Sequence, residues 1–456
     1  MDYILVMSVL YAFLFGICYS FVLCKPEKPT LGKKQDNILM IAGGGLLGML
    51  ILQLLITWHM PGHIQDTGLF RAWAAFGDQH AVWEYYTTDL YVDYPPVYLY
   101  VLYLVGLIAK VLGISYDGNG FIVMVRSIPI IFDGITSLFI YRFTKEFVGE
   151  RKALLLAVLS AFNPLNILNS TLWGQIDSVT GLMVAAMLIF LYKKKYVSSC
   201  TMFAVLVLTK PQMIIFSPLM GFVVFFDLIE ALRTPGERAS MLKQVGFSIL
   251  AMAAVFFIVP LPITGGNYGL LLKKYTEAVG MYQYATLNAP NFYGMLGGNW
   301  RPNSDLLGFF SYKTWGFIFI VSISLTVGIV SWLCKDRRKV FYLGVFMVMG
   351  IFMLAHGMHE RYLHPMFLLM LIIYALTGDR KNLVLYGAFS VTSFINCGVV
   401  LHLNHKNGFI YGDNPYFIFL SALQVVMFVF WTVHAVRLLQ QKKPLPKQKK
   451  KLPKKR

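Results

Sequence analysis

The sequence predicts an all-α polytopic membrane protein. Of its 456 residues, 57% are hydrophobic and only 14% are charged, and the mean hydropathy is +0.61. Successive apolar runs also have the length of about 20 residues that an α-helix needs to cross a bilayer. Soluble globular domains are normally less apolar than this, so the composition excludes that class.

The distribution of basic residues predicts which loops lie in the cytoplasm. One set of loops is rich in Lys and Arg: 25–34, 142–152, 193–195, 233–243, 335–339, 379–381 and the tail. The other set is long, aromatic and poor in net charge: 59–119, 173–177, 264–313, 356–364 and 402–415. Cytoplasmic loops carry the excess of Lys and Arg in membrane proteins, so the first set is expected inside and the second outside.

This assignment predicts a bundle of about 13 transmembrane helices, with the N-terminus outside and the C-terminus in the cytoplasm. The apolar run 95–112 is an exception, because as a span it would move two basic loops outside; it is expected to be a juxtamembrane helix in the outer interface. The first run lacks a preceding basic region and is expected to be retained rather than cleaved. The expected spans are 3–23, 37–58, 121–141, 153–171, 175–192, 197–210, 213–230, 245–262, 314–334, 340–356, 364–378, 383–401 and 416–436.

Five regions follow from this topology. They are an extra N-terminal helix with its cytoplasmic loop (1–36), the main transmembrane module with the outer loop 59–119 (37–262), a long outer loop (263–313), the C-terminal helices with the outer His-rich segment 356–364 (314–436), and a cytoplasmic polybasic tail (437–456). The long outer loop is a candidate lid over a site, a common role for such loops.

The net charge of +18 does not indicate a nucleic-acid partner, because much of it lies in the tail. Residues 437–456 carry ten basic and no acidic side chains, interrupted by three prolines. Such a segment has too little apolar surface to fold and is expected to attract anionic lipid headgroups or to act only as a topology anchor. The five cysteines are scattered without CxxC spacing, so neither a disulfide framework nor a zinc site is expected.

Candidate site residues gather at the outer ends of the predicted helices. Asp66 follows a span closely and is suited to accept a proton from a sugar hydroxyl; the alternative is a cap for a helix from Thr67 to Phe76. Asp93 and Tyr94 precede two prolines at the start of the interfacial helix. They are candidates for sugar or acceptor binding, with a helix cap as the competing interpretation of Asp93.

Further polar residues follow along the chain. The turn Trp173-Gly174-Gln175-Ile176-Asp177 offers directional hydrogen bonds to hydroxyls, with Asp177 as a helix cap in the alternative. Arg126 and Asp133 are seven residues apart on one helix face and are expected to form a structural pair, although Arg126 also lies near enough to the outer end to reach a phosphate.

Cationic residues suggest an anion site. Lys210 is a natural phosphate ligand, or a lysine that snorkels to lipid headgroups. His359 and Arg361 lie in one segment with His356 and Glu360. They are suited to bind a phosphate and to neutralise its charge as it departs as a leaving group. The HxxHE order does not match a zinc protease, so no metal is required, and a role for a divalent metal stays open.

Together these clusters resemble the GT-C superfamily of integral-membrane glycosyltransferases over residues 37–378. The resemblance rests on Asp66, Tyr94-Pro95-Pro96, Arg126, the Trp-Gly-Gln-Ile-Asp turn, Thr209 to Gln212, Asn288 to Asn291, and His359-Glu360-Arg361. The last element is similar to the His-Glu-Lys of dolichyl-phosphate-glucose-dependent glucosyltransferases. The extra helix 3–23, and Arg361 where a lysine is frequent, depart from the pattern and leave the subfamily open.

The resemblance implies a polyprenyl-phosphate sugar donor, an extracytoplasmic site and inversion at the anomeric carbon. Asp66 is then the expected general base. Lys210, His359, Arg361 and Arg126 are expected to hold the donor phosphate. The residues expected to bind sugar or acceptor are Asp93, Tyr94, Trp173, Gln175, Asp177, Gln212, Asn288, Asn291, His356 and Glu360.

The expected acceptor is a cell-envelope glycan or glycolipid, because no soluble domain is present to dock a bulky protein, and the expected location is a bacterial plasma membrane. The competing function is a flippase for lipid-linked glycans. Transport requires ionisable residues deep in the membrane and paired helix breaks, and only Asp133 is expected to be deep.

Overall fold

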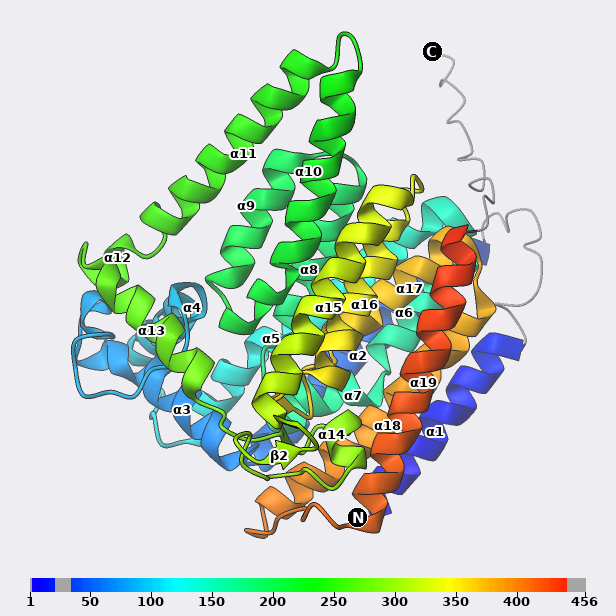
Figure 1. Ribbon diagram of the computed structural model, residues 1–456. Coiled ribbons are helices and arrows are strands. Elements are labelled where there is room, and N and C mark those ends of the chain that lie inside the picture. The colour runs from blue at the N-terminus through cyan, green and yellow to red at the C-terminus, as the bar shows by residue number, and fades with distance from the viewer. Residues whose placement is uncertain (1, 21–33, 441–456) are drawn as a thin grey trace.

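The computed structural model describes residues 2–20 and 34–440, which form an almost entirely helical protein (Figure 1). Residues 21–33 of the first basic loop and 441–456 of the polybasic tail lie outside the described part. The α-helices are α1 (Asp2–Cys18), α2 (Lys34–His59), α3 (Ile64–Ala75), α4 (Pro96–Val111), α5 (Asn119–Val148), α6 (Glu150–Ala161), α7 (Pro164–Ile167), α8 (Asp177–Tyr192), α9 (Tyr196–Val207), α10 (Ser217–Arg233), α11 (Arg238–Ile258), α12 (Leu261–Thr264), α13 (Tyr268–Gly280), α14 (Phe292–Met295), α15 (Tyr312–Leu333), α16 (Lys339–Leu354), α17 (Pro365–Thr377), α18 (Arg380–Asn404) and α19 (Pro415–Gln440). The remaining elements are the short turns η2 (Phe76–Asp78), η3 (Val82–Glu84), η4 (Leu168–Trp173) and η5 (Pro211–Phe216), and the strands β1 (Thr286–Leu287), β2 (Leu306–Leu307), β3 (Phe310–Ser311) and β4 (Met358–His359).

The predicted class, an all-α polytopic membrane protein, is confirmed. Within residues 2–20 and 34–440, seven helices are long and apolar enough to cross a membrane, or eight if α6 and the bent segment Pro164–Trp173 form one span with a 41° break. The other expected spans coincide with apolar helices of 10–17 residues, namely α1, α8, α9, α16 and α17. Length and composition therefore support fewer than the expected 13 or so spans, and that number stays a prediction.

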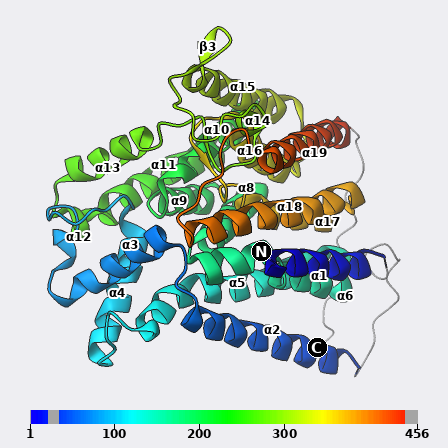
Figure 2. The same ribbon diagram turned by 90° about the horizontal axis from the view of Figure 1, so that it is seen from below.

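Two of these shorter helices, α16 and α17, lie in the middle of the bundle. Nearly every residue of α16 and α17 is buried, whereas α2 and α11 leave most side chains exposed. A helix that is apolar all round belongs inside a bundle, and one with an exposed apolar face suits lipid. Figure 2 shows the helices in successive rows, with α2 at one margin and α15 at the other.

The basic loops meet at one end of the bundle. Arg337, between α15 and α16, pairs with Asp227 at the end of α10 and donates to the Leu191 carbonyl at the end of α8. At this end of the bundle, Nε2 of His434 in α19 also lies 2.9 Å from Oδ2 of Asp379, which connects α17 to α18. In Figure 1 the α10–α11 connection lies at the top, and the start of α1 lies at the bottom with α14 and β2.

The expected juxtamembrane helix 95–112 is α4, which starts at Pro96 and lies with α3, α12 and α13 beside the main bundle (Figure 2). Prolines suit a helix start because the first N–H groups have no partner within the helix. The Tyr100 hydroxyl donates to the Val259 carbonyl at 2.6 Å, and that of Tyr275 donates to the Val207 carbonyl at 2.8 Å. These bonds tie the peripheral helices to the bundle.

The long outer loop 263–313 is ordered. It contains α13, α14 and the β2–β3 hairpin, and its strand β1 pairs in parallel with β4 of the His-rich segment. In this pairing Thr286 lies opposite Met358, and Leu287 opposite His359. The loop and the His-rich segment are therefore one folded unit, and the role of the loop as a lid stays a prediction.

Candidate functional site

A sharp turn between α2 and α3 positions Asp66. Gly62 has φ +83, and a Cβ there would lie 1.8 Å from Nη2 of Arg126, so only glycine fits. The next residue, His63, is the N-cap of α3, and its Nδ1 accepts the Asp66 backbone N–H at 3.4 Å. Asp66 therefore lies in the first turn of α3, and the alternative interpretation of Asp66 as the helix cap is wrong.

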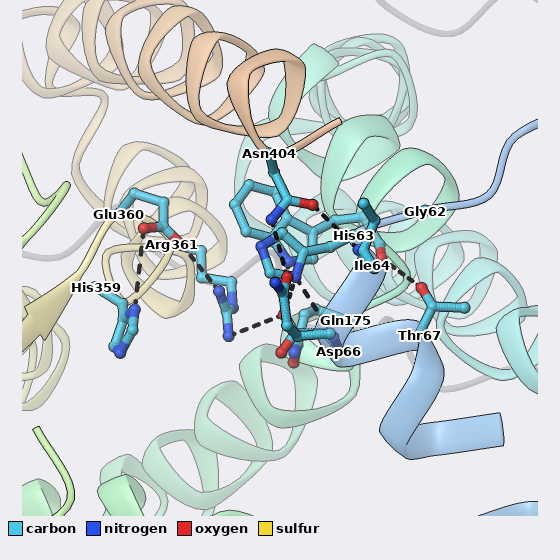
Figure 3. A network of polar contacts seen from close by, with 12 residues as sticks. Gly62, His63, Ile64, Asp66, Thr67, Gln175, His359, Glu360, Arg361 and Asn404 are labelled. Atoms are coloured by element: carbon cyan, nitrogen blue, oxygen red, sulfur yellow. Dashed lines mark hydrogen bonds and ion pairs between the residues drawn. The ribbon is translucent and has the colours of Figure 1, made fainter. Parts of the chain in front are cut away.

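The Asp66 carboxylate is held by two side chains from distant segments, Trp173 and Arg361, and lies close to His63 of its own segment (Figure 3). Its Oδ2 accepts the Trp173 indole N–H at 2.6 Å, lies 3.3 Å from Nη2 of Arg361 and is 3.5 Å from Nδ1 of His63. Burial alone would raise the pKa of Asp66. The charge of Arg361, with His63 and the Trp173 N–H, outweighs burial and holds the pKa well below its usual range.

Trp173 ends the π-helical turn η4, which is closed by Gly174 in the left-handed conformation. The indole ring stacks on His63, with centroids 4.7 Å apart and planes 4° apart. The Arg361 guanidinium lies 5.1 Å from the same ring, within the range of a cation–π contact. Trp173 thus packs against both neighbours of Asp66 while it also donates to that carboxylate.

A second ion pair adjoins the first. Lys210 and Asp177 are in direct contact, and both side chains are only 3% exposed. Asn169 donates to Oδ2 of Asp177 at 2.9 Å, and Nε of Arg361 lies 4.0 Å from the same oxygen. Asp177 is the first residue of α8 but makes no capping bond, so the interpretation of Asp177 as a cap is wrong.

The segment after β4 brings Arg361 to this cluster. Its Nη1 donates to Oε1 of Glu360 at 2.8 Å, and Oε2 of Glu360 lies 3.9 Å from Nδ1 of His359. Burial raises the pKa of Glu360 to about 7, against the lowering effect of Arg361. Burial and the charge of Arg361 lower the pKa of His359 to about 3, so this ring is neutral at pH 7.

A cavity of about 340 Å³ opens beside these pairs. Eight of the predicted site residues line it: Asp66, Asp93, Tyr94, Gln175, Lys210, Gln212, His356 and Arg361. The wall also has an apolar part, which includes Leu69, Phe70, Ile214, Ala278, Met281 and Met358. The cavity therefore combines two cations and two carboxylates with apolar surface, and its volume lies within the range of small-molecule sites.

Asp93 differs from Asp66 in forming no salt bridge among the described residues. Its Oδ1 is buried without a hydrogen-bond partner there, and burial, with the charge of Asp66, raises its pKa to about 6. The N-cap of α4 is Pro95, without a side-chain capping bond, so the interpretation of Asp93 as a cap is wrong. Tyr94 is anchored by its hydroxyl, which donates to Oε1 of Gln175 at 3.2 Å.

Arg126 is not part of the cavity wall. The side chain is fully buried, and it donates to the carbonyls of Met60, Pro61 and Thr171 and to the Thr67 hydroxyl. The predicted pairing of Arg126 with Asp133 is wrong, because Asp133 instead accepts a hydrogen bond from Ser170. Arg126 thus joins the turn after α2 to η4.

Two other predicted residues also lie outside the cavity wall. The Asn288 side chain accepts from Asn299 and from the Trp300 indole, each at 3.0 Å. Asn291 caps α14 and donates to the Phe352 carbonyl at 3.0 Å. Trp173, Asp177, His359 and Glu360 touch the residues of the wall but do not line the cavity themselves.

Some contributors were not predicted from the sequence. Tyr275, Met281 and Tyr282 of the long outer loop line the cavity, as does Tyr362. The chain has 26 tyrosines, and no sequence motif distinguishes Tyr275, Tyr282 and Tyr362 from the others. Asn404, at the end of α18, donates to Oε1 of Gln65 at 2.9 Å and accepts the backbone N–H of Ile64, and so holds the start of α3 (Figure 3).

A smaller cavity of about 20 Å³ lies deeper, with Asp133, Asn166 and His364 in its wall. Both ring nitrogens of His364 and Oδ1 of Asn166 are buried and lack partners within the described residues. This space has room for about one water molecule, which buried polar groups of this kind commonly bind.

In residues 2–20 and 34–440, no group of three or more His, Cys, Asp and Glu side chains is arranged to hold a metal ion. No protein-family model matches the chain, and no curated protein matches it in sequence.

Proposed function

We propose that this protein is a membrane glycosyltransferase of the GT-C type. It moves a hexose from a polyprenyl-phosphate carrier to a hydroxyl of a cell-envelope glycan or glycolipid. The observation that carries the proposal is the shared cavity of Asp66, Arg361 and Lys210. A carboxylate can take the proton of an attacking hydroxyl, and two cations can hold a departing phosphate, so one cavity contains the groups for both ends of a displacement.

The apolar part of the wall favours a lipid-linked donor. Leu69, Ile214 and Met281 lie in the same cavity as the cations, and Ile214 is also exposed. A donor with a phosphate between sugar and lipid tail needs this combination of charged and apolar surface. A nucleotide sugar would instead need polar contacts along its whole length.

The position of the cavity agrees with such a donor. The cavity lies at the end of the bundle opposite the basic loops, and the positive-inside rule assigns those loops to the cytoplasm. The site is then extracytoplasmic, in a plasma membrane, where sugars are delivered on lipid carriers flipped across the bilayer.

The reaction is a single displacement. The acceptor oxygen attacks the anomeric carbon of the hexose while its proton passes to Asp66, and the bond from that carbon to the phosphate oxygen breaks. Arg361 and Lys210 stabilise the negative charge that returns to the phosphate, which leaves as polyprenyl phosphate. Attack opposite the leaving group inverts the anomeric carbon. Asp93, Tyr94, Gln175, Gln212 and His356 are the wall residues available to the sugar and the acceptor.

The test is an assay of the full chain in nanodiscs with a panel of polyprenyl-phosphate hexoses and glycan or glycolipid acceptors. The expected result is a glycosylated acceptor together with free polyprenyl phosphate. Asp66→Asn is expected to lower the rate by about 10²–10⁴-fold, the usual contribution of a general base. Asp89→Asn, at an exposed acid of the same outer loop, is the matched control with unchanged rate. In proteoliposomes, movement of intact donor across the membrane without release of polyprenyl phosphate would establish a flippase instead.

A further inference from the structure

Both cations of the cavity wall are already paired with carboxylates. Lys210 contacts Asp177, Arg361 contacts Asp66 and Glu360, and Nε of Arg361 lies 4.0 Å from Asp177. A donor phosphate that takes up the N–H groups directed at these carboxylates must therefore replace at least one carboxylate. The two pairs differ in this respect, because Lys210 and Asp177 are both 3% exposed, whereas Asp66 is 19% exposed.

The Arg361 guanidinium has one edge that suits a phosphate. Glu360 occupies Nη1 at 2.8 Å, while Nε is buried and has no hydrogen-bond partner in the described residues, with Oδ2 of Asp177 4.0 Å away. Nη2, on the same edge as Nε, faces Asp66 at 3.3 Å. Two phosphate oxygens bind an arginine best through two neighbouring N–H groups. Occupation of the Nε–Nη2 edge would satisfy the unpaired Nε and displace Asp66, while Glu360 keeps its hold on Nη1.

We propose that Asp66 and the donor phosphate compete for the Nε–Nη2 edge of Arg361, so that donor binding releases Asp66 to act as the base. This inference rests on the proposed function and adds to it a control of the base by the donor. The paired carboxylate is a weak base, because the adjacent positive charge stabilises its ionised form. Once the phosphate takes the guanidinium, Asp66 keeps the Trp173 N–H but loses its closest charge, and its basicity rises. An acceptor hydroxyl is then activated only when a donor is in place.

The competition predicts that one substitution lowers the transfer rate but raises the affinity for the phosphate. Asp66→Asn removes the base but also removes the competitor of the phosphate. Farnesyl phosphate, which carries the phosphate and a short isoprenoid chain, is the probe, and its Kd is measured by titration of the purified full chain at pH 8. We expect Asp66→Asn to bind it about tenfold more tightly than the wild type, a typical size for coupling between two ligands of one group.

Two controls separate this competition from the loss of a negative charge. Asp93→Asn removes a carboxylate from the same cavity that forms no ion pair with Arg361, and we expect it to tighten binding less than Asp66→Asn does. Arg361→Lys keeps the charge but lacks the two neighbouring N–H groups of the guanidinium. In this background, adding Asp66→Asn is expected to leave the affinity for farnesyl phosphate unchanged. Thermal unfolding of each variant checks that it is folded.

The outcomes distinguish the two proposals. Equal tightening by Asp66→Asn and Asp93→Asn, or tightening that persists with Arg361→Lys, overturns the competition but leaves the phosphate site and the proposed function standing. Failure of the wild type and of every variant to bind farnesyl phosphate removes the phosphate site, and both proposals fall with it.

Discussion

Trp173 and Asp66, 107 residues apart in the chain, are joined by an indole N–H that donates to the carboxylate Oδ2 at 2.6 Å. The bond fixes one oxygen of the carboxylate and directs it toward Arg361, because Nη2 of Arg361 approaches the same oxygen. In the proposed reaction Trp173 is a positioning residue, since it acts through Asp66.

Trp173→Phe tests that role. Phenylalanine keeps an aromatic ring for His63 and Arg361 but cannot donate to Asp66. We expect the transfer rate to fall by about 10- to 100-fold, since removing one partner of a buried hydrogen bond costs about 1–3 kcal/mol. The measurement is kcat and KM with the donor identified in the panel assay. A positioning role predicts a loss mainly in kcat and a shift of the pH–rate profile to higher pH, as the pKa of Asp66 rises.

Trp431→Phe is the matched control. Trp431 is as buried as Trp173 and donates its indole N–H to Asn382, away from the cavity. The Trp431→Phe variant carries the same chemical change, and we expect it to lose thermal stability without a change in kcat. Equal losses of kcat in the two variants would contradict a positioning role for Trp173.

The sequence predicted the location of the site better than its internal contacts. Asp66, Lys210 and Arg361 each follow or precede an apolar run, and the charge of the loops assigned all three to one side. Helices that alternate in direction bring such ends together, so a shared cavity was predictable. The choice of partner was not, because the pairing of Arg361 with Asp66 depends on how β4 and α3 lie relative to each other.

The prediction for Arg126 shows where helix spacing misleads. Arg126 and Asp133 share a face of α5, but seven residues correspond to about 10 Å along the axis, too far for direct contact. Each side chain found closer partners from other segments: carbonyls of the turn after α2 and of η4 for Arg126, and Ser170 for Asp133. Such partners come from tertiary packing, which spacing within one helix does not predict.

Arg126→Ala is expected to reduce folded protein rather than phosphate affinity specifically. The substitution leaves the carbonyls of Met60, Pro61 and Thr171 without their donor, and unpaired buried polar groups each cost about 1–3 kcal/mol. Gly62→Ala should have a similar effect by a different route, because its Cβ would collide with the same guanidinium. The measurements are the yield of monodisperse protein and the midpoint of thermal unfolding.

Arg126→Lys separates the two roles that the sequence left open. Lysine keeps the positive charge but supplies fewer donors, so stability is expected to fall while farnesyl phosphate affinity of the folded fraction stays within about twofold of the wild type. A loss of affinity that exceeds the loss of stability would place Arg126 at the phosphate after all.

The histidine that caps α3 predicts a loss of stability in acid. Burial lowers the pKa of His63 from 6.5 to about 4, so the unfolded chain takes up a proton in this interval that the folded chain does not. The stability that depends on neutral His63 is therefore complete above pH 6.5 and declines as the pH falls toward 4. His359 acts in the same direction, with its pKa lowered to about 3.

His63→Asn should flatten this dependence. Asparagine can still accept the Asp66 N–H as a helix cap but does not titrate. We expect the slope of unfolding free energy between pH 6.5 and 4.5 to fall by up to about 1.4 kcal/mol per pH unit, the value for one proton. Thermal unfolding in detergent at several pH values measures it. His59→Asn, at an exposed position, is the control with an unchanged slope, and equal slopes for all three proteins would refute the prediction.

The pair of Lys210 with Asp177 allows folding and phosphate binding to be tested separately. Lys210→Met leaves a buried carboxylate without its cation, and breaking such a pair costs about 3–5 kcal/mol. Adding Asp177→Asn removes the orphaned charge, so the double variant is expected to recover most of the thermal stability. It should not recover phosphate affinity, because Lys210 itself lines the cavity; we expect farnesyl phosphate to bind at least about tenfold more weakly than to the wild type.

The pair of Arg337 with Asp227 at the opposite end provides the matched control, as Arg337→Met with Asp227→Asn. That double variant removes the same types of charge far from the cavity and should bind the phosphate as the wild type does. If the Lys210→Met, Asp177→Asn variant also binds it normally, the lysine serves only to neutralise Asp177, and the anion must be held by Arg361 without a second cation.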